Sequence, residues 1–382
     1  MSPLSSVSRV PLVVWGVALC AGAHGYQIND SLSVGGLAAG VWQCQQVAGN
    51  DEREGAEDTC AAAGPLQPEL DWHPIENGLL HIKLGFALGN GLKGETVLSL
   101  APWAADVEDD VENMNGRKFS HILNAWYRHE FPVGGRSALQ WTLGIVDATD
   151  YLDGNRFAND EFTQFMNEAL VNGPNVFLPS YDAGTALVWQ RGRWVVSGVY
   201  MNVGENDGGH SYDFVGAEVH YRVHTGLGEG NYRFLIDYTD DSFTEEHGDG
   251  LSARHGAIAS IDQDFNDVVG GWLRFGWQSQ DATVSFSALY SGGLNFHGTA
   301  WGREHDNIGL GYARLPGANA EYDYAQVAEI YYRLALGRYM ALTADLQYQQ
   351  NALRYRSSLT AWVAGLRLVV EISRLLRSIL IG

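Results

Sequence analysis

The chain alternates apolar and polar residues along most of its length after about residue 120. In an extended strand, successive side chains point to opposite faces. Phe234 and Ile236 therefore share one face of the segment 231–239, while Arg233 and Asp237 share the other. This pattern predicts a series of antiparallel strands of about ten residues each. The same period recurs near 123–131, 138–147, 216–224, 269–279, 328–336, 339–349 and 360–372.

The kind of residue on each face indicates which β-architecture these strands form. Arg, Glu, Asp and Gln recur on the polar face, and Tyr, Trp or Phe often bound the apolar face. A soluble sandwich buries its apolar faces against each other, whereas a transmembrane barrel turns them to lipid and lines a wet lumen with the polar ones. Short connections ("RGR", 191–193; "LGR", 336–338) accompany longer polar loops, as in such barrels.

We therefore predict an all-β fold, a transmembrane antiparallel β-barrel of about 16 strands, in one domain over residues 26–372. The first part of the chain has a weaker pattern. There we expect strands near 31–44, 66–73, 78–88 and 96–102. Helical spanning is not expected, because the mature chain has no uninterrupted run of about eighteen apolar residues.

Both ends of the chain lie outside the expected barrel. Residues 1–25 resemble a secretion signal, with basic Arg9, the apolar run Val10–Leu19 and the small residues of "CAGAHG". Residues 373–382 are expected to form a C-terminal tail. Export also bears on Cys44 and Cys60, which flank an acidic loop and are expected to form a disulfide rather than a metal site.

Composition limits the possible partners. The hydrophobic fraction is 46%, aromatic residues make up 12%, and the formal net charge is −21. Such a negative charge argues against nucleic acid and against an anionic membrane surface as partners. It also leads us to expect a weak cation preference of any pore, and no strong anion preference. We expect no cofactor and no metal.

The segment "DATDYLDGNRFANDEFTQFMNEAL" (147–170) interrupts the strand pattern with carboxylates, amides and aromatics. Within it, Phe162, Phe165, Met166 and Ala169 have helical spacing, and Asn159 or Asp160 could cap the helix. A short helix of this kind could fold inward and narrow a pore. It could equally lie in an external loop with no role in the pore, and spacing alone does not separate the two.

Three stretches resemble the carbohydrate-selective outer-membrane porins of the OprB type. They are "GIVDATDYLDGNRFANDEFTQFMNEALVNGP" (144–174), "ALYSGGLNFHGTAWGREHDNIGLGYARL" (288–315), and "AEIYYRLALGRYMALTADLQYQQNAL" (328–353) together with "AWVAGLRL" (361–368). The resemblance implies a sixteen-stranded barrel in a Gram-negative outer membrane that passes sugars passively. Such barrels usually end on an aromatic residue that the assembly machinery recognises, whereas this chain continues past Ile372.

A sugar path needs aromatic faces for stacking and charged or amide groups for hydrogen bonds. For the constriction we expect Asp147, Asp150, Tyr151, Asp153, Asn155, Arg156, Asn159, Asp160 and Glu161, with Trp301, Arg303 and Glu304 of the "WGRE" turn. For the luminal wall we expect Arg128, Glu130, Glu218, Arg222, Arg233, Asp237, Arg274, Gln278, Arg333, Asp345, Gln347, Arg367 and Glu371. The alternative for the wall residues is a purely structural ladder of ion pairs.

The expected partners are mono- or oligosaccharides and other small solutes, outer-membrane lipid, the barrel-assembly machinery and further copies of the chain. Three rival functions stay open at this point. One is a general-diffusion porin without a sugar site. Another is a secreted β-rich protein that binds or hydrolyses carbohydrate. The third is an adhesin or purely structural barrel, which would conduct no ions. Motifs for zinc proteases, serine hydrolases and phosphate-binding loops are missing from the sequence, so we do not expect an enzyme.

Overall fold

The computed structural model describes residues 25–48, 57–96, 98–105, 107, 111, 114–117, 120–135, 137–355 and 357–380. Nearly all of the expected signal peptide (1–25) and most of the loop between Cys44 and Cys60 lie outside this range. Within it, eighteen strands form one sheet in which every neighbouring pair is antiparallel, and β12 and β13 form a separate small hairpin.

The elements follow the alternating pattern of the sequence closely. The strands are β1 (Tyr26–Asn29), β2 (Leu32–Ala48), β3 (Thr59–Ala63), β4 (Leu66–Trp72), β5 (Gly78–Leu84), β6 (Ile122–Pro132), β7 (Ser137–Val146), β8 (Asp182–Arg191), β9 (Trp194–Val203), β10 (Tyr212–Thr225), β11 (Gly228–Thr239), β12 (Phe243–Thr244), β13 (Leu251–Ser252), β14 (His255–Asp264), β15 (Val269–Gln278), β16 (Ala288–His297), β17 (Asn307–Pro316), β18 (Tyr322–Leu336), β19 (Met340–Leu353) and β20 (Leu359–Glu371). The helices are η1 (Met114–Gly116), η2 (Ala148–Asp150), α2 (Glu168–Val171), η3 (Gly298–Trp301) and α3 (Ile372–Leu380).

The sheet closes on itself because its first long strand pairs with its last. β2 and β20 are joined from Leu37 opposite Glu371 to Ala48 opposite Thr360. On its other edge, β2 pairs with both β3 and β4, which together occupy one strand position. The short strand β1 pairs with the beginning of β2 on the same edge as β20, beyond the end of β20. In the described part of the chain, the wall of the barrel therefore has sixteen strand positions, as the sequence predicted.

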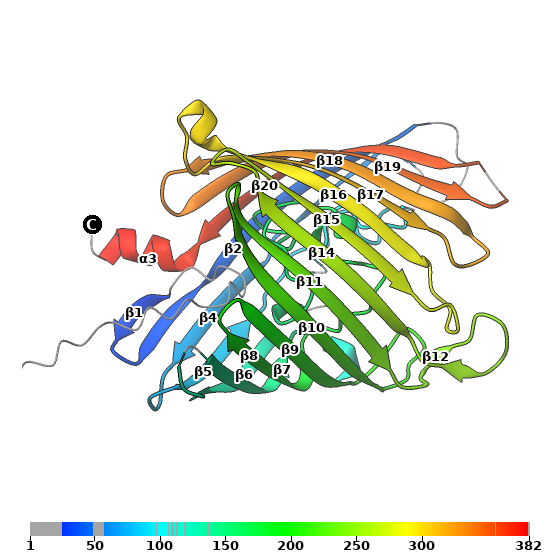
Figure 1. Cartoon of the computed structure of the whole chain (residues 1–382). Helices are drawn as coiled ribbons and strands as arrows, with labels where there is room; N and C mark the ends of the chain where they lie inside the picture. Colours follow the sequence, from blue (N-terminus) through cyan, green and yellow to red (C-terminus); the bar gives the residue numbers. More distant parts are fainter. Residues whose placement is uncertain are drawn as a thin grey trace, which may run out of the picture.

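The two ends of the barrel differ in their connections. Turns such as 192–193 and 226–227 join strands at the end that also carries α3 and β1, while the longest connections and the β12–β13 hairpin lie at the opposite end (Figure 1). In outer-membrane barrels, short turns face the periplasm and long loops face outward. We call these two ends the turn end and the loop end.

The two faces of the wall differ in burial as the alternation predicted. On β11, Phe234 and Ile236 are 55% and 52% exposed, while Leu235 between them is 1% exposed. The exposed row contains large apolar side chains on most strands, which is the surface that lipid covers in a barrel. Among the described residues, no helix is both long and apolar enough to cross a bilayer.

Three features of the elements differ from the expectations. The described residues between 96 and 102 form no strand, and some of their polar groups contact side chains of the wall instead; Ser99, for example, donates to Asn351 at 3.1 Å. The short strand β3 was not predicted. Residues 373–380 of the expected tail belong to α3, whose Arg374 pairs with Glu371 at 2.6 Å.

The expected disulfide is present: Cys44 and Cys60 are joined between β2 and β3.

Candidate functional site

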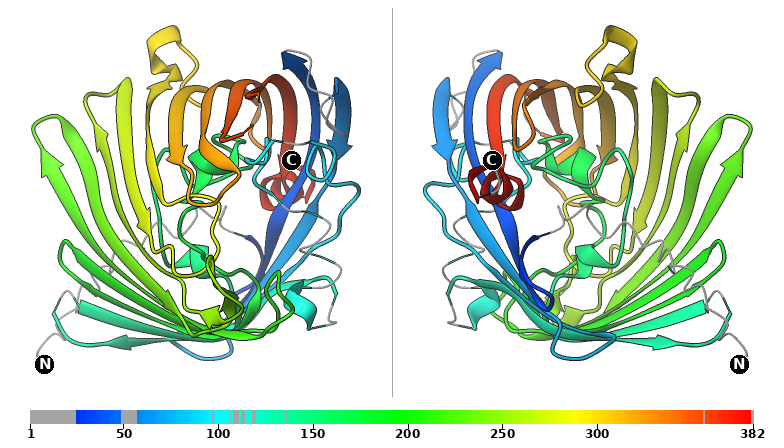
Figure 2. Two further views of the ribbon diagram at one scale, coloured as in Figure 1. Left: turned by 90° about the vertical axis from the view of Figure 1, so that its right-hand side faces the viewer. Right: turned by 90° about the vertical axis from the view of Figure 1, so that its left-hand side faces the viewer.

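Residues 147–181, between β7 and β8, lie inside the barrel against its wall. We call them the inner segment. In Figure 2, the blue-green and green chain between the strands runs within the ring that the strands form. Hydrogen bonds join it to inward-facing residues of distant strands. Asn155 donates to Ser260 of β14 at 3.0 Å, and Asn167 donates to Gln347 of β19 at 3.1 Å.

The helix expected over this segment is mostly absent. Asp160 does begin one turn, where it accepts hydrogen bonds from the backbone N–H of Phe162 and the hydroxyl of Thr163. The only α-helical turn described between residues 147 and 181 is α2, capped by the side chain of Asn167. The prediction was wrong because the wall takes the backbone groups that a helix would pair internally.

Glu329 of β18 and Arg367 of β20 are the wall residues that do this. The two carboxylate oxygens of Glu329 accept from the backbone N–H groups of Met166 and Asn167 at 2.7 and 3.0 Å. Arg367 donates to the carbonyl oxygens of Glu161 and Gln164 at 2.6 and 2.8 Å. Charged partners of this kind make stronger hydrogen bonds than neutral groups, so they outweigh a short helix.

A buried ion pair holds the middle of the inner segment. Arg274 of β15 pairs with Asp153 at 2.9 Å, and both side chains are fully buried. Arg274 also donates to the carbonyl oxygen of Ala158 at 2.9 Å. On the neighbouring side, Glu218 of β10 accepts from the backbone N–H of Asp153 at 2.8 Å.

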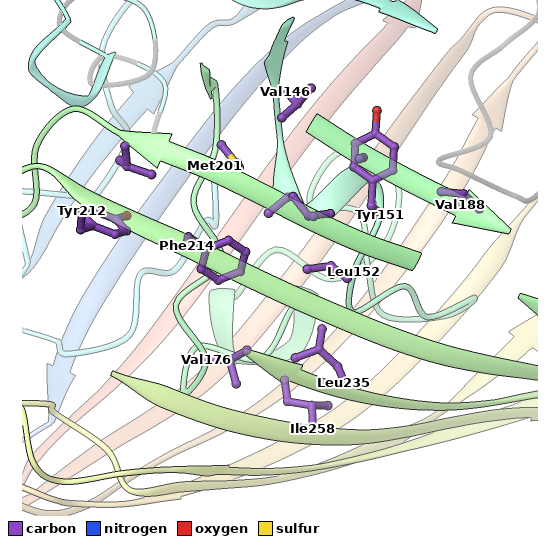
Figure 3. Packing of buried hydrophobic residues seen from close by; sticks show 14 of the residues in the cluster. Val146, Tyr151, Leu152, Val176, Val188, Met201, Tyr212, Phe214, Leu235 and Ile258 are labelled. Carbon is purple, nitrogen blue, oxygen red and sulfur yellow. The ribbon is translucent and has the colours of Figure 1, made fainter. Parts of the chain in front are cut away.

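The apolar side of the inner segment packs on the wall as well. Tyr151, Leu152 and Val176 lie among inward-facing residues of β8 to β14, including Phe214 and Leu235 (Figure 3). Further along, Phe165 meets Trp272 and Tyr331 edge-on, at ring separations of 5.7 and 5.1 Å. The core of the protein is therefore the layer between this segment and the wall, rather than a contact between two sheets.

The described part of a second connection, between β5 and β6, also reaches inside the barrel, and the sequence analysis missed it. The carbonyl oxygen of Pro102 accepts from Gln43 of β2 and Gln347 of β19, the two strands that flank β20, at 2.9 and 2.7 Å. Trp103 donates to the carbonyl oxygen of Glu161 at 3.1 Å and packs edge-on against Phe162. The two connections therefore support each other.

A polar cavity of about 600 Å³ remains between the inner segment and the wall formed by β8 to β11. Its lining consists of Thr149, Asp150, Tyr151, Leu152, Gly154, Asn155, Arg156, Asn159, Asp160, Thr163, Gln164, Val188, Arg193, Val195, Ser197, Glu218, His220, Arg222, Val223, His224, Glu229, Gly230, Asn231 and Arg233.

The cavity contains charges of both signs. The inner segment contributes Asp150, Asp160 and Arg156, while the wall and the turn before β9 contribute Arg193, Arg222 and Arg233 together with Glu218 and Glu229. Burial, together with repulsion from Asp147, raises the pKa of Asp150 to about 6. Tyr151 is the one Tyr, Phe or Trp residue of this lining, and it is 7% exposed. The cavity therefore offers hydrogen-bonding groups rather than aromatic faces.

The structure separates the residues expected at the constriction. Six line the cavity: Asp150, Tyr151, Asn155, Arg156, Asn159 and Asp160. Asp147 caps η2 by accepting from the backbone N–H of Thr149, Asp153 is buried against Arg274, and the backbone of Glu161 contacts Trp103 and Arg367. Trp301, Arg303 and Glu304 lie elsewhere, in the turn between β16 and β17 at the turn end, where Arg303 pairs with Asp306.

The residues expected on the luminal wall also divide. Glu218, Arg222 and Arg233 line the cavity. A second group is buried inside the barrel: Arg274, Gln278, Asp345, Gln347 and Arg367. The other five are half-buried. Arg128 lies over the ring of Trp126, and Glu130 accepts a hydrogen bond from Gln140. Arg333 donates to the carbonyl oxygen of His305, Glu371 pairs with Arg374, and Asp237 lies near the loop end of β11.

Several cavity residues were not among the sequence candidates. His220 was visible in the alternation of 216–224, which places it on the same face as Glu218 and Arg222. Asn231 had the corresponding signal in 231–239. Arg193 had none, because it lies in a turn where the two-residue period does not apply.

Comparison with known families assigns this architecture. The family model "Carbohydrate-selective porin, OprB family" matches residues 83–371. The chain belongs to the OprB family of carbohydrate-selective porins. A protein of Aquifex aeolicus (strain VF5) is 30% identical over 251 residues, which is 64% of this chain and 69% of that protein. An OprB-family barrel of this kind is an outer-membrane porin for carbohydrates and small solutes.

Solved structures share the fold at low sequence identity. The high-pH structure of Pseudomonas putida OprB superposes with a TM-score of 0.74 at 13% identity, covering 90% of this chain and 94% of that one. The outer-membrane channel DcaP of Acinetobacter baumannii gives a TM-score of 0.55 at 12% identity, covering 91% and 99%. Family and fold are thus those of porin channels rather than enzymes.

Proposed function

We propose that carbohydrates cross this OprB-family barrel through the cavity beside the inner segment, and that this segment forms the constriction. The supporting observation is that the segment lies in the lumen and that a polar cavity of about 600 Å³ lies beside it. Sugar hydroxyls are donors and acceptors, so the carboxylates and amides of the segment and the guanidinium groups of the wall can bind them from both sides. Several such weak contacts allow the solute to leave again.

We also propose that the solute leaves chemically unchanged and that lipid covers the outward face. The barrel-assembly machinery and further copies of the chain are the protein partners we propose. Exposed aromatic residues such as Trp277 and Tyr290, 51% and 52% exposed, support contact with lipid.

Single-channel recording in a planar bilayer tests the constriction. Gly154 lines the cavity, and a Cβ added there would have the Nε atom of Arg233 as its nearest neighbour, at 3.7 Å. Gly154→Phe should therefore fill part of the passage and lower the conductance at least twofold. Gly198→Phe is the matched control, because Gly198 lies on β9 next to the cavity residue Ser197, and its added Cβ would have no neighbour within 4 Å.

The same recordings separate a carbohydrate channel from a general-diffusion porin. Neutral sugars at millimolar concentration should reduce the wild-type current reversibly, and a mass balance across the bilayer should recover the sugar intact. Equal conductance of G154F and G198F would refute the constriction. An unchanged current at every sugar concentration would instead support the general-diffusion alternative.

A further inference from the structure

Two arginines face each other across neighbouring strands at the turn end of the cavity. The backbone N–H of Arg222 on β10 donates to the carbonyl oxygen of Arg193, just before β9, at 2.9 Å. Their sequence neighbours Trp194 and Tyr221 are in register with each other, and their rings lie 4.5 Å apart. Arg193 and Arg222 both line the cavity, so the two side chains point into the lumen together.

This pair lacks the counter-charges that the other cavity arginines have. Arg233 pairs with Asp262 at 2.6 Å, and Arg156 pairs with Asp264 at 2.5 Å. In the described part of the chain, neither Arg193 nor Arg222 has a carboxylate within 4.0 Å. Like charges on directly opposite residues of two strands repel each other, so the arrangement is unfavourable until an anion joins it.

The surroundings leave this end of the cavity positive. His220, on the same face of β10 as Arg222, lies with its Nε2 atom 2.8 Å from the Oδ1 atom of Asn231 and adds no counter-charge. Glu229 also lines the cavity and is the nearest carboxylate by register, diagonal to Arg222 across β10 and β11. One carboxylate thus stands beside two guanidinium groups, while Asp150 and Asp160 belong to the opposite side of the cavity.

We propose that Arg193 and Arg222 form a subsite for a sugar that carries a carboxylate, such as a hexuronate. The proposal deepens the proposed function and rests on it, because the sugar must enter the same cavity. The planar guanidinium groups can bind the carboxylate through paired, charge-assisted hydrogen bonds. The ring hydroxyls then face Asn159 and Gln164 of the inner segment, which line the opposite side.

The test compares galacturonate with galactose, which differ only in a carboxylate in place of a hydroxymethyl group. Each is added to one side of a planar bilayer holding the full-length channel, and the concentration that halves the current is measured. Galacturonate should reach half-block at about tenfold lower concentration than galactose, since hydrogen bonds to charged groups add 1.5–3 kcal/mol. Addition from the turn end should give the larger effect.

Three variants make the test specific. R193Q and R222Q should bring the two half-blocking concentrations within about twofold of each other. R191Q is the matched control, because Arg191 is only two residues from Arg193 but borders a surface groove with Val133 and Trp189 instead of the cavity. It should keep the tenfold difference. Heat-modifiability in detergent gels checks that each variant forms the barrel.

The possible outcomes are distinct. Equal block by galacturonate and galactose in the wild type, or an undiminished difference in both R193Q and R222Q, overturns the subsite. Block by acetate at the same concentration as galacturonate overturns it as well, because the site would then recognise any carboxylate. Absence of block by every sugar refutes the proposed function itself and not only the subsite.

Discussion

At the scale of single residues, the buried pair of Arg274 and Asp153 joins the wall to the inner segment. Removing one member leaves a buried charge without its partner, which costs about 3–5 kcal/mol. Arg274→Met should therefore lower the stability of the barrel by this amount. It should also raise the conductance or its noise, because the middle of the inner segment loses its tie to β15.

Thermal unfolding, followed by heat-modifiability, and single-channel recording measure the two effects of this change. Arg314→Met is the matched control. Arg314 lies on the outward face of β17, over the ring of Tyr324 at 3.7 Å, and has no ion pair in the described part of the chain. If R274M melts and conducts like R314M, the inner segment does not depend on the buried pair.

Asp150 predicts a pH dependence. Its pKa is raised from 3.8 to about 6 by burial first and by repulsion from Asp147 second. The carboxyl is therefore charged at pH 7.5 and mostly neutral at pH 5, so the cation preference of the pore should weaken over this interval. The folded state holds the proton of Asp150 more tightly than the unfolded chain does, so the contribution of this carboxyl to stability is fully present below about pH 4 and is lost as the pH rises through about 6.

Reversal potentials at pH 7.5 and pH 5 check this expectation. Asp150→Asn should flatten the change, while Asp281→Asn, in the exposed loop between β15 and β16, should keep the wild-type profile. A pH response of D150N as large as that of the wild type would assign the effect to other carboxyls.

Residue by residue, the sequence predicted which way a side chain points better than what it touches. Alternation placed Glu218, Arg222 and Arg233 on the inward face, and these three line the cavity. It placed Arg274 and Arg367 on the same face, but both are buried against the inner segment. The difference depends on contacts between residues more than a hundred positions apart, which a local period does not contain.

At the scale of elements, the inner segment illustrates how tertiary contacts override local propensity. The apolar residues from Phe162 to Ala169 are buried, as their spacing suggested, but not as one helix. Glu329 and Arg367 on remote strands bond the peptide groups that a helix would use. The path of the described residues between β5 and β6 was missed for a related reason, since an irregular chain that packs inside a barrel has no sequence period.

The disulfide between β2 and β3 should affect the stability of the barrel but not its conductance. The disulfide between Cys44 and Cys60 closes a loop over a sequence separation of 16, which in the entropic model stabilises the fold by about 3 kcal/mol. On β2, Cys44 alternates with the inward-facing residues Gln43 and Gln45, which are 0% and 3% exposed. The double variant Cys44→Ser/Cys60→Ser should therefore be less stable but conduct normally.

Denaturant titration with and without reductant measures this effect. Wild-type protein with reductant should unfold at the same denaturant concentration as the double variant without reductant. Reductant should have no effect on the double variant. A change in single-channel conductance of the double variant would contradict the outward placement of the disulfide.

At the scale of the whole molecule, the strand period alone led to the sixteen-stranded barrel. This worked because lipid outside and water inside impose opposite demands on neighbouring residues along every strand. Which strands contact the inner segment, and where the free passage remains, were not accessible from the sequence. They depend on how two long connections fill the lumen, and residues such as Pro102 gain their role only from that packing.

The distribution of charge over the barrel gives the last prediction. The net charge is −21, and the described connections of the loop end carry many carboxylates, among them Asp240, Asp241, Glu245 and Glu246 between β11 and β14. Cations should therefore concentrate at the loop-end entrance, while the arginine pair at the turn end opposes their exit. The result should be a weak preference for cations that depends strongly on salt, because the screening length falls from about 10 Å at 0.1 M to about 3 Å at 1 M. Reversal potentials in potassium chloride gradients at both concentrations measure it. A preference for anions at low salt would show that the pair of Arg193 and Arg222, and not the carboxylates of the loop-end entrance, controls the passage of ions.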